Sequence, residues 1–191
     1  TMRLNALASS FLDLARLESG RVQFRKTVFS VADLMYECKD VMSSKAIEDN
    51  IQLRVESSED LPLLDADRDK IKQVLLNLLS NSIKYNRPNG TVMLRSESKE
   101  TELVIYIQDT GVGIPDESLP HLFEKFYRVR EHESRASGTG LGLSICKQII
   151  HGHGGRIEVK SKIGVGTVFM IFLPKTGSQP QPHTETPSAK E

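Results

Sequence analysis

Hydrophobic and polar positions recur with different periods along the chain, and these periods predict its elements. In residues 1–20, apolar side chains recur at spacings of three and four, which predicts an amphipathic helix ending at Gly20. The positions in this stripe are Leu4, Leu7, Phe11 and Leu14. Such a helix packs either on its own domain or on another helix or subunit. Because it stands at the N-terminus and precedes a strand-like linker, we favour the second arrangement.

The rest of the chain up to about residue 174 alternates between strand and helix patterns. A period of two predicts strands over 22–29, 51–57, 91–98 and 102–109, and a hairpin over 156–174. A helix begins after the N-cap Ser30 and runs to about Glu48, and another begins after the N-cap Asp67 and runs to Tyr85. A third helix begins at Leu141 and closes at glycines. This order predicts an α+β fold, a two-layer α/β sandwich with helices on one face of a mixed sheet.

Two segments depart from this alternation. Residues 114–140 contain a short helical piece around Ser118–Phe123, then a charged stretch and glycines, a composition typical of a lid over a site. From Lys175 onward the chain is rich in proline, serine and threonine, which predicts a disordered tail. The predicted domains are therefore a helical segment over 1–21, a main domain over 22–174 and a tail over 175–191.

Composition narrows the class of protein. Lysine plus arginine equals aspartate plus glutamate at 25 each, which argues against a nucleic-acid partner held by a basic surface. The two cysteines are too few for a disulfide framework and favour a reduced, intracellular setting. No apolar run approaches the roughly 20 residues that span a membrane, so we expect no membrane segment in this chain.

A polar stripe on the second predicted helix indicates a ligand. Asn77, Asn81, Lys84 and Tyr85 share one face of a helix whose other positions are mostly apolar. The alternative is an ordinary solvated face.

Three glycine clusters follow this helix. DTGVGIP, residues 109–115, ends a strand, and GTGLGLS, residues 138–144, precedes a helix, where backbone N–H groups suit phosphates. GVGTVF, residues 164–169, lies in the final hairpin. Taken singly, the first and third also suit plain turns.

Together and in this order, the motifs resemble the catalytic and ATP-binding domain of sensor histidine kinases, in the superfamily that includes the gyrase and MutL ATPases. The resemblance covers residues 22–174: NLLSNSIKY is similar to the N box, DTGVGIP to the G1 box, FEKFYR to the F box and GTGLGLSICKQIIHGHGG to the G2 box. Residues 1–21 resemble the end of the second helix of the dimerisation and phosphoacceptor hairpin. The resemblance implies the histidine-kinase-like ATPase fold, with ATP and Mg²⁺ as ligands.

The resemblance also implies roles for single residues. Asn81 would bind Mg²⁺, Lys84 the phosphates and Tyr85 the adenine ring, while Asp109 would accept a hydrogen bond from the adenine amino group and Thr167 would reach the adenine side. The other cofactor-binding positions it implies are Asn77, Gly111, Gly113, Ile114, Phe126, Gly138, Thr139, Gly140, Leu141, Gly142 and Leu143. Phe123 and Phe126 would tether the lid.

The implied catalytic residues are Asn77, Lys84 and Arg128, with Arg130 and Arg135 as further lid cations. In hydrolysing relatives a glutamate that activates water stands at the position of Asn77. An amide has no useful basicity near pH 7, so we expect slow hydrolysis and transfer to another acceptor.

The acceptor histidine should precede residue 1. His132 and Glu133 imitate the start of an acceptor motif but lie in the lid, so we discount them. The resemblance implies a response-regulator receiver domain as partner, a homodimer in the longer protein and a cytoplasmic location. The alternatives are a serine-phosphorylating anti-sigma-type kinase and a nucleotide-binding scaffold or pseudokinase.

Overall fold

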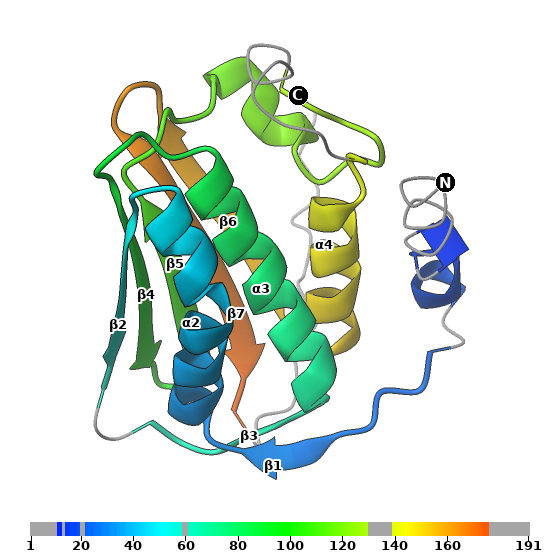
Figure 1. Cartoon of the computed structure of the whole chain (residues 1–191). Helices are drawn as coiled ribbons and strands as arrows, with labels where there is room; N and C mark the ends of the chain where they lie inside the picture. The colour runs from blue at the N-terminus through cyan, green and yellow to red at the C-terminus, as the bar shows by residue number, and fades with distance from the viewer. Residues whose placement is uncertain (1–10, 13, 20–21, 59–60, 130–138, 176–191) are drawn as a thin grey trace, which may run out of the picture.

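A computed structural model describes residues 11–12, 14–19, 22–58, 61–129 and 139–175 (Figure 1). The described elements follow the predicted order. They are β1 Thr27–Phe29, α2 Val31–Glu48, β2 Gln52–Ser57, β3 Leu64–Ala66, α3 Arg68–Lys84, β4 Thr91–Ser98, β5 Glu102–Asp109, the 3₁₀ helix η1 Asp116–His121, α4 Gly142–Gly152, β6 Arg156–Lys162 and β7 Gly166–Pro174.

Five of the described strands form one mixed sheet in the order β2-β4-β5-β7-β6. The β2–β4 pair is parallel and the other pairs are antiparallel. β1 and β3 form a separate antiparallel pair at the base of the domain. The predicted α+β sandwich with a mixed sheet is confirmed.

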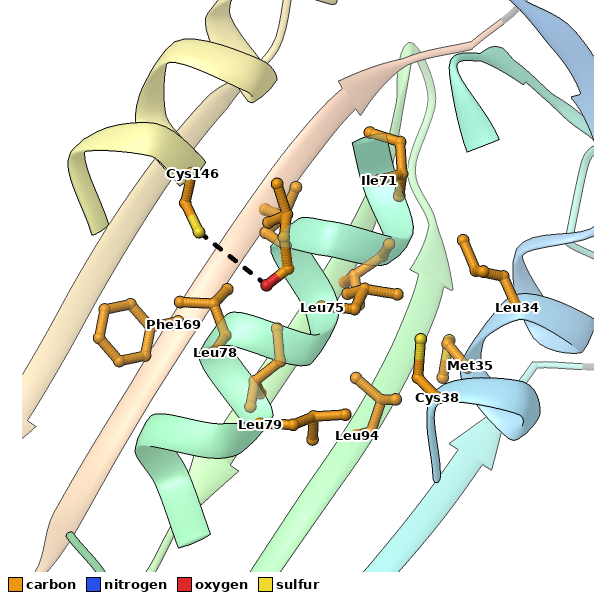
Figure 2. Packing of buried hydrophobic residues seen from close by; sticks show 14 of the residues in the cluster. Leu34, Met35, Cys38, Ile71, Leu75, Leu78, Leu79, Leu94, Cys146 and Phe169 are labelled. Carbon is orange, nitrogen blue, oxygen red and sulfur yellow. Dashed lines mark hydrogen bonds between the residues drawn. The ribbon is translucent and has the colours of Figure 1, made fainter. Parts of the chain in front are cut away.

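Helices α2, α3 and α4 lie on one face of the large sheet (Figure 1). Ser30 accepts the N–H of Asp33 and Asp67 that of Lys70, so both predicted N-caps are confirmed. Figure 2 shows leucines of α3 packed between Cys38 of α2 and Cys146 of α4. This core fixes one side of α3 and leaves the opposite stripe available for a site.

The other face of the sheet carries a smaller apolar cluster of Val104, Met170 and Phe172. Long cationic side chains cover it: the Arg156 guanidinium lies 3.7 Å from the Phe172 ring centre, and that of Arg95 lies 4.5 Å from Tyr106. Arginine can bury its stem on apolar surface while its charge stays in water, so this face closes without a second layer of helices.

The N-terminal helix contacts the domain through its described residues. Leu14 is 1% exposed and belongs to the main core cluster, whereas Phe11 is 49% exposed. Glu18 forms an ion pair with Lys125 at 2.7 Å. In this structure the helix therefore packs on its own domain, the arrangement that the sequence did not favour; Leu4 and Leu7 lie outside the described residues. No helix among the described residues is both long and apolar enough to cross a membrane.

The strand predicted over 22–29 is shorter, because residues before Thr27 dock elsewhere. The Phe24 ring lies 4.3 Å from the His153 ring and fills the space beside Gly152, at the end of α4. The Arg25 N–H donates to the Asp67 carboxylate at 2.9 Å, and the Asp67 N–H donates to His153 Nε2 at 3.0 Å. These contacts replace a strand ladder and anchor the start of α3.

Candidate functional site

A cavity of about 310 Å³ lies between α3, the segment after β5, the start of α4 and the β6–β7 hairpin. The volume falls within the range of small-molecule sites. All members of the predicted stripe, Asn77, Asn81, Lys84 and Tyr85, line it. The polar stripe thus faces a cavity, which excludes the ordinary solvated face.

One end of the cavity is built around Asp109, which is 8% exposed. Its Oδ1 accepts the N–H of Gly111 at 2.9 Å and the N–H of Thr167 at 3.1 Å. Burial raises the pKa of Asp109, and these two N–H donors act in the opposite direction. The Asp109 carboxylate therefore joins the segment after β5 to the start of β7 at this end of the cavity.

Two serines complete this end. Ser161 Oγ lies 2.8 Å from Thr167 Oγ1 and accepts the Ile114 N–H at 2.8 Å. Ser82 Oγ is buried, lines the cavity and lies close enough to the Asp109 carboxyl to help lower its pKa. The Asp109 end therefore gathers hydroxyls, a carboxylate and backbone N–H groups at one place.

The other end of the cavity is cationic. Burial lowers the pKa of Lys84, and the nearby charges of Arg128 and Lys45 lower it further. Lys84 Nζ lies 5.2 Å from the centre of the Tyr85 ring, whose hydroxyl has a pKa raised by burial. Like charges brought together in this way are relieved by a bound anion, so this end suits phosphate groups.

Asn77 connects two helices as well as lining the cavity. Its Nδ2 donates to Cys146 Sγ at 3.0 Å, and its Oδ1 lies 2.7 Å from the position that a Cβ on Gly142 would occupy. Burial raises the pKa of the Cys146 thiol to about 12, so the sulfur stays protonated. Asn77 therefore holds the start of α4 against α3.

The two described ends of the predicted lid meet at one point. The Phe126 N–H donates to the Gly140 carbonyl oxygen at 2.9 Å. Gly140 has a φ of +71°, and a Cβ there would lie 2.7 Å from the Phe126 backbone, so glycine is required. Phe126 itself has a φ of 62° and its side chain is 54% exposed. Its contribution in this structure is through its backbone.

The cavity gathers most of the predicted site residues. Gly111, Phe126 and Leu141 do not line it; Leu141 is buried in the core and Gly111 packs against the Tyr85 carbonyl. The predicted Gly138, Arg130 and Arg135 lie outside the described residues, as does the discounted His132. The lining residues that sequence reasoning missed are Ser80, Ser82, Leu122, Tyr127, Val129 and Phe169. Ser80 and Ser82 are the sequence neighbours of Asn81, and this adjacency to a predicted site residue was the available signal that they line the cavity.

The residues present fit an adenine nucleotide and a divalent cation. A buried carboxylate suits a donor such as the adenine amino group, and the cationic end suits phosphates. The described residues contain no cluster of three or more histidine, cysteine, aspartate or glutamate side chains that would hold a metal. The Asn81 amide oxygen in the cavity lining is of the kind that Mg²⁺ takes as a ligand together with phosphate and water oxygens.

Comparison with known families agrees with this geometry. Residues 66–177 match the model of the histidine kinase-, DNA gyrase B- and HSP90-like ATPases. Sensor protein SrrB of Staphylococcus aureus is 37% identical over 174 residues, which are 91% of this chain and 30% of SrrB. The chain thus spans about a third of the length of the curated relatives it matches.

Solved structures are similar as well. Full-length ShkA in complex with AMPPNP superposes with a TM-score of 0.82 at 27% identity, covering 94% of this chain and 37% of ShkA. Histidine kinase ThkA in complex with the response regulator TrrA gives a TM-score of 0.71 at 29% identity, covering 91% of this chain and 49% of ThkA.

Proposed function

We propose that this chain transfers the ATP γ-phosphoryl group to a histidine upstream of residue 1. The chain belongs to the histidine kinase-, DNA gyrase B- and HSP90-like ATPase family and is the ATP-binding catalytic region of a sensor histidine kinase. The observation that carries the proposal is the polar stripe of α3, which faces Asp109 and Thr167 across one cavity.

Asp109 selects the base. Its carboxylate accepts the adenine 6-amino group, whereas guanine places an acceptor there and would leave a buried charge unpaired. Thr167 Oγ1 and Ser82 Oγ lie at the same end and hold the adenine side, directly or through water. Recognition of the adenine base is thus assigned to the Asp109 end of the cavity.

Lys84 and Arg128 stabilise the phosphates, and Asn81 holds the Mg²⁺ that supplies further charge neutralisation. In the transfer, a neutral imidazole nitrogen attacks the γ-phosphorus. The bond to the β–γ bridging oxygen breaks, and ADP leaves with that electron pair. The chain's contribution is positioning and charge, so the catalytic assignment remains Asn77, Lys84 and Arg128.

Asn77 favours transfer over hydrolysis. Its amide provides no base for water, and its Nδ2 is engaged with Cys146 Sγ. We infer slow ATP turnover by the chain alone. The phosphohistidine would supply an aspartate of a response-regulator receiver domain; a response regulator is what ThkA binds in the solved complex. We place this reaction in the cytoplasm, in a protein that dimerises through its N-terminal helical hairpin.

The test combines this chain, γ-labelled ATP and Mg²⁺ with a longer version of the same protein. The longer version includes the upstream helix and carries Asp109→Asn, which disables its own ATP site. We expect acid-labile label on the longer chain. A version that also lacks the upstream histidine is the matched control and should stay unlabelled.

Other outcomes separate the alternatives. Acid-stable label would indicate a serine-phosphorylating kinase and overturn the assignment. Nucleotide binding by this chain without any labelling would contradict transfer between separate chains. Failure to bind nucleotide at all would favour a pseudokinase that binds a partner or scaffolds a dimer.

A further inference from the structure

Arg87, three residues beyond the end of α3, joins two loops that are far apart in the sequence. Its Nε donates to the Thr110 carbonyl oxygen at 2.5 Å, and its terminal nitrogen Nη2 donates to the Gly111 carbonyl oxygen at 3.3 Å. The same nitrogen donates to the carbonyl oxygens of Gly164 at 2.7 Å and Val165 at 3.3 Å. One guanidinium thus contacts the segment after β5 and the β6–β7 turn at once.

These two loops form the Asp109 end of the cavity. Thr110 and Gly111 directly follow Asp109, and Gly164 and Val165 directly precede the strand that contains Thr167. The distance between the loops therefore sets how the Asp109 carboxylate meets the Thr167 N–H, a contact of 3.1 Å. A further contact, from the Gly164 N–H to the Val112 carbonyl oxygen at 2.9 Å, joins the loops on the same side.

Arg87 is itself held in place. Its backbone N–H donates to Asn86 Oδ1 at 3.0 Å, and Asn86 Nδ2 donates to the Thr91 carbonyl oxygen at 3.2 Å. Asn86 is 8% exposed, so the stem of Arg87 leaves from a fixed, buried point. The guanidinium itself stays at the surface and does not line the cavity.

The geometry of the hydrogen bonds from the guanidinium to the two loops requires an arginine side chain. Guanidinium presents five donors in a rigid plane and reaches acceptors on both sides, whereas a lysine ammonium is a compact point charge on a flexible stem. Carbonyl oxygens from two loops that converge on one plane match the first geometry.

We propose that Arg87 is a positioning residue for nucleotide binding, which fixes the two loops that carry Asp109 and Thr167 without touching the nucleotide. The inference rests on the proposed ATP site. It predicts that loss of the guanidinium weakens binding of the adenine end and leaves the cationic end intact. The loss should therefore appear equally with ADP and with ATP.

The experiment measures ADP and ATP affinity by calorimetry, with Mg²⁺, for the unchanged chain and for Arg87→Lys and Arg87→Ala. We expect both variants to lose about tenfold in affinity for either nucleotide, the size expected for charge-assisted hydrogen bonds. Arg54→Lys is the matched control, since Arg54 is an exposed arginine on β2 that bonds only to Gln52 among the described side chains. It should bind as the unchanged chain does.

A second readout separates positioning from general stability. Hydrogen exchange should accelerate at the amides of Val112 and Gly164 in both Arg87 variants, while exchange in α3 and β5 and the melting temperature stay unchanged. Affinities equal to those of the unchanged chain would overturn the proposal. So would a fall in affinity that accompanies faster exchange throughout the domain. If the unchanged chain binds neither nucleotide, the proposed function fails and takes this inference with it.

Discussion

The two ends of the cavity are built in different ways. At the Asp109 end, backbone N–H groups, a carboxylate and hydroxyls bond to one another, so the geometry exists before any ligand arrives. At the Lys84 end, the pKa of Lys84 is lowered by burial and by the cations nearby. The first end is organised by hydrogen bonds, and the second is a concentration of charge that a ligand completes.

This difference divides the work of recognition. A preformed set of hydrogen bonds discriminates between bases, because a wrong base leaves buried groups unpaired. A cluster of cations attracts any phosphate and discriminates little. We therefore expect changes at the Asp109 end to affect all adenine nucleotides alike, and changes at the Lys84 end to depend on the number of phosphates.

The largest effect should come from Asp109→Asn. ADP affinity should fall roughly 100-fold, since the change replaces a charged acceptor by a neutral amide. The raised pKa of Asp109 means that the ionised group costs folding stability at neutral pH, and its contribution improves only as pH falls. The ligand-free variant should therefore melt about 2–5 °C higher.

Calorimetry and thermal unfolding at pH 7.5 test both parts. Asp65→Asn, at an exposed position of β3, is the matched control and should change neither. Weak binding together with a lower melting temperature would contradict the view that Asp109 is kept for binding at the expense of stability.

The next largest effect should come from Lys84→Met. Removing this cation should weaken ATP binding about tenfold and ADP binding less, because the lost interaction is with phosphate charge. The measurement is the ratio of the two affinities at low and high salt. Lys160→Met, at an exposed position of β6, serves as control. Equal losses of affinity for both nucleotides would contradict the view that the two ends of the cavity bind different parts of the nucleotide.

A smaller effect is expected at Asn77, where the cationic end meets the core. Asn77→Ala should lower the free energy of unfolding by about 1 kcal/mol, because the hydrogen bond to Cys146 joins α3 and α4. Denaturant unfolding of Asn77→Ala, Cys146→Val and the double variant measures the coupling. Strict additivity would show that this contact contributes nothing to stability.

An effect of similar size is expected at His153, at the far end of α4 from the cavity. Burial lowers the pKa of His153 in the folded state, so its stabilising effect is complete above the ordinary histidine range and is lost as pH falls below it. Between pH 7 and 5, the free energy of unfolding of the unchanged chain should fall by about 1 kcal/mol more than that of His153→Gln.

Denaturant unfolding at both pH values provides this measurement, with the exposed His121→Gln as control. ADP affinity at pH 7.5 should be the same for the unchanged chain and His153→Gln. A large loss of affinity would mean that the far end of α4 is coupled to the cavity.

Much of the fold was predictable because local chemistry and tertiary packing agree. Ser30 and Asp67 cap the helices that their positions predict, and the period of two in 91–98 and 102–109 matches paired strands. The linker was not predictable in this way. Residues 22–29 alternate as a strand, but Phe24 finds a better contact at His153, a residue 129 positions away, so only Thr27–Phe29 pairs.

The site divides similarly. The stripe of α3 was predictable because helical periodicity alone puts Asn77, Asn81 and Lys84 on one face. Arg87 was not, since its role depends on two loops more than 20 and more than 75 residues away meeting at one point. Gly113 lines the cavity, and the structure adds a second requirement at this position: its φ is +77°, and a Cβ there would lie 2.2 Å from the Lys162 carbonyl oxygen at the end of β6.

The hydrogen bond from Phe126 to Gly140 has a consequence for how such domains diversify. This contact joins the two ends of the segment between Phe126 and Gly140, and the described residues of that segment, Tyr127, Arg128, Val129 and Thr139, line the cavity. Lengthening a closed loop costs only about 0.6 kcal/mol for each doubling of its length. Residues inserted within this segment should therefore cost little folding free energy, provided that the Phe126–Gly140 contact and the cavity-lining residues are kept.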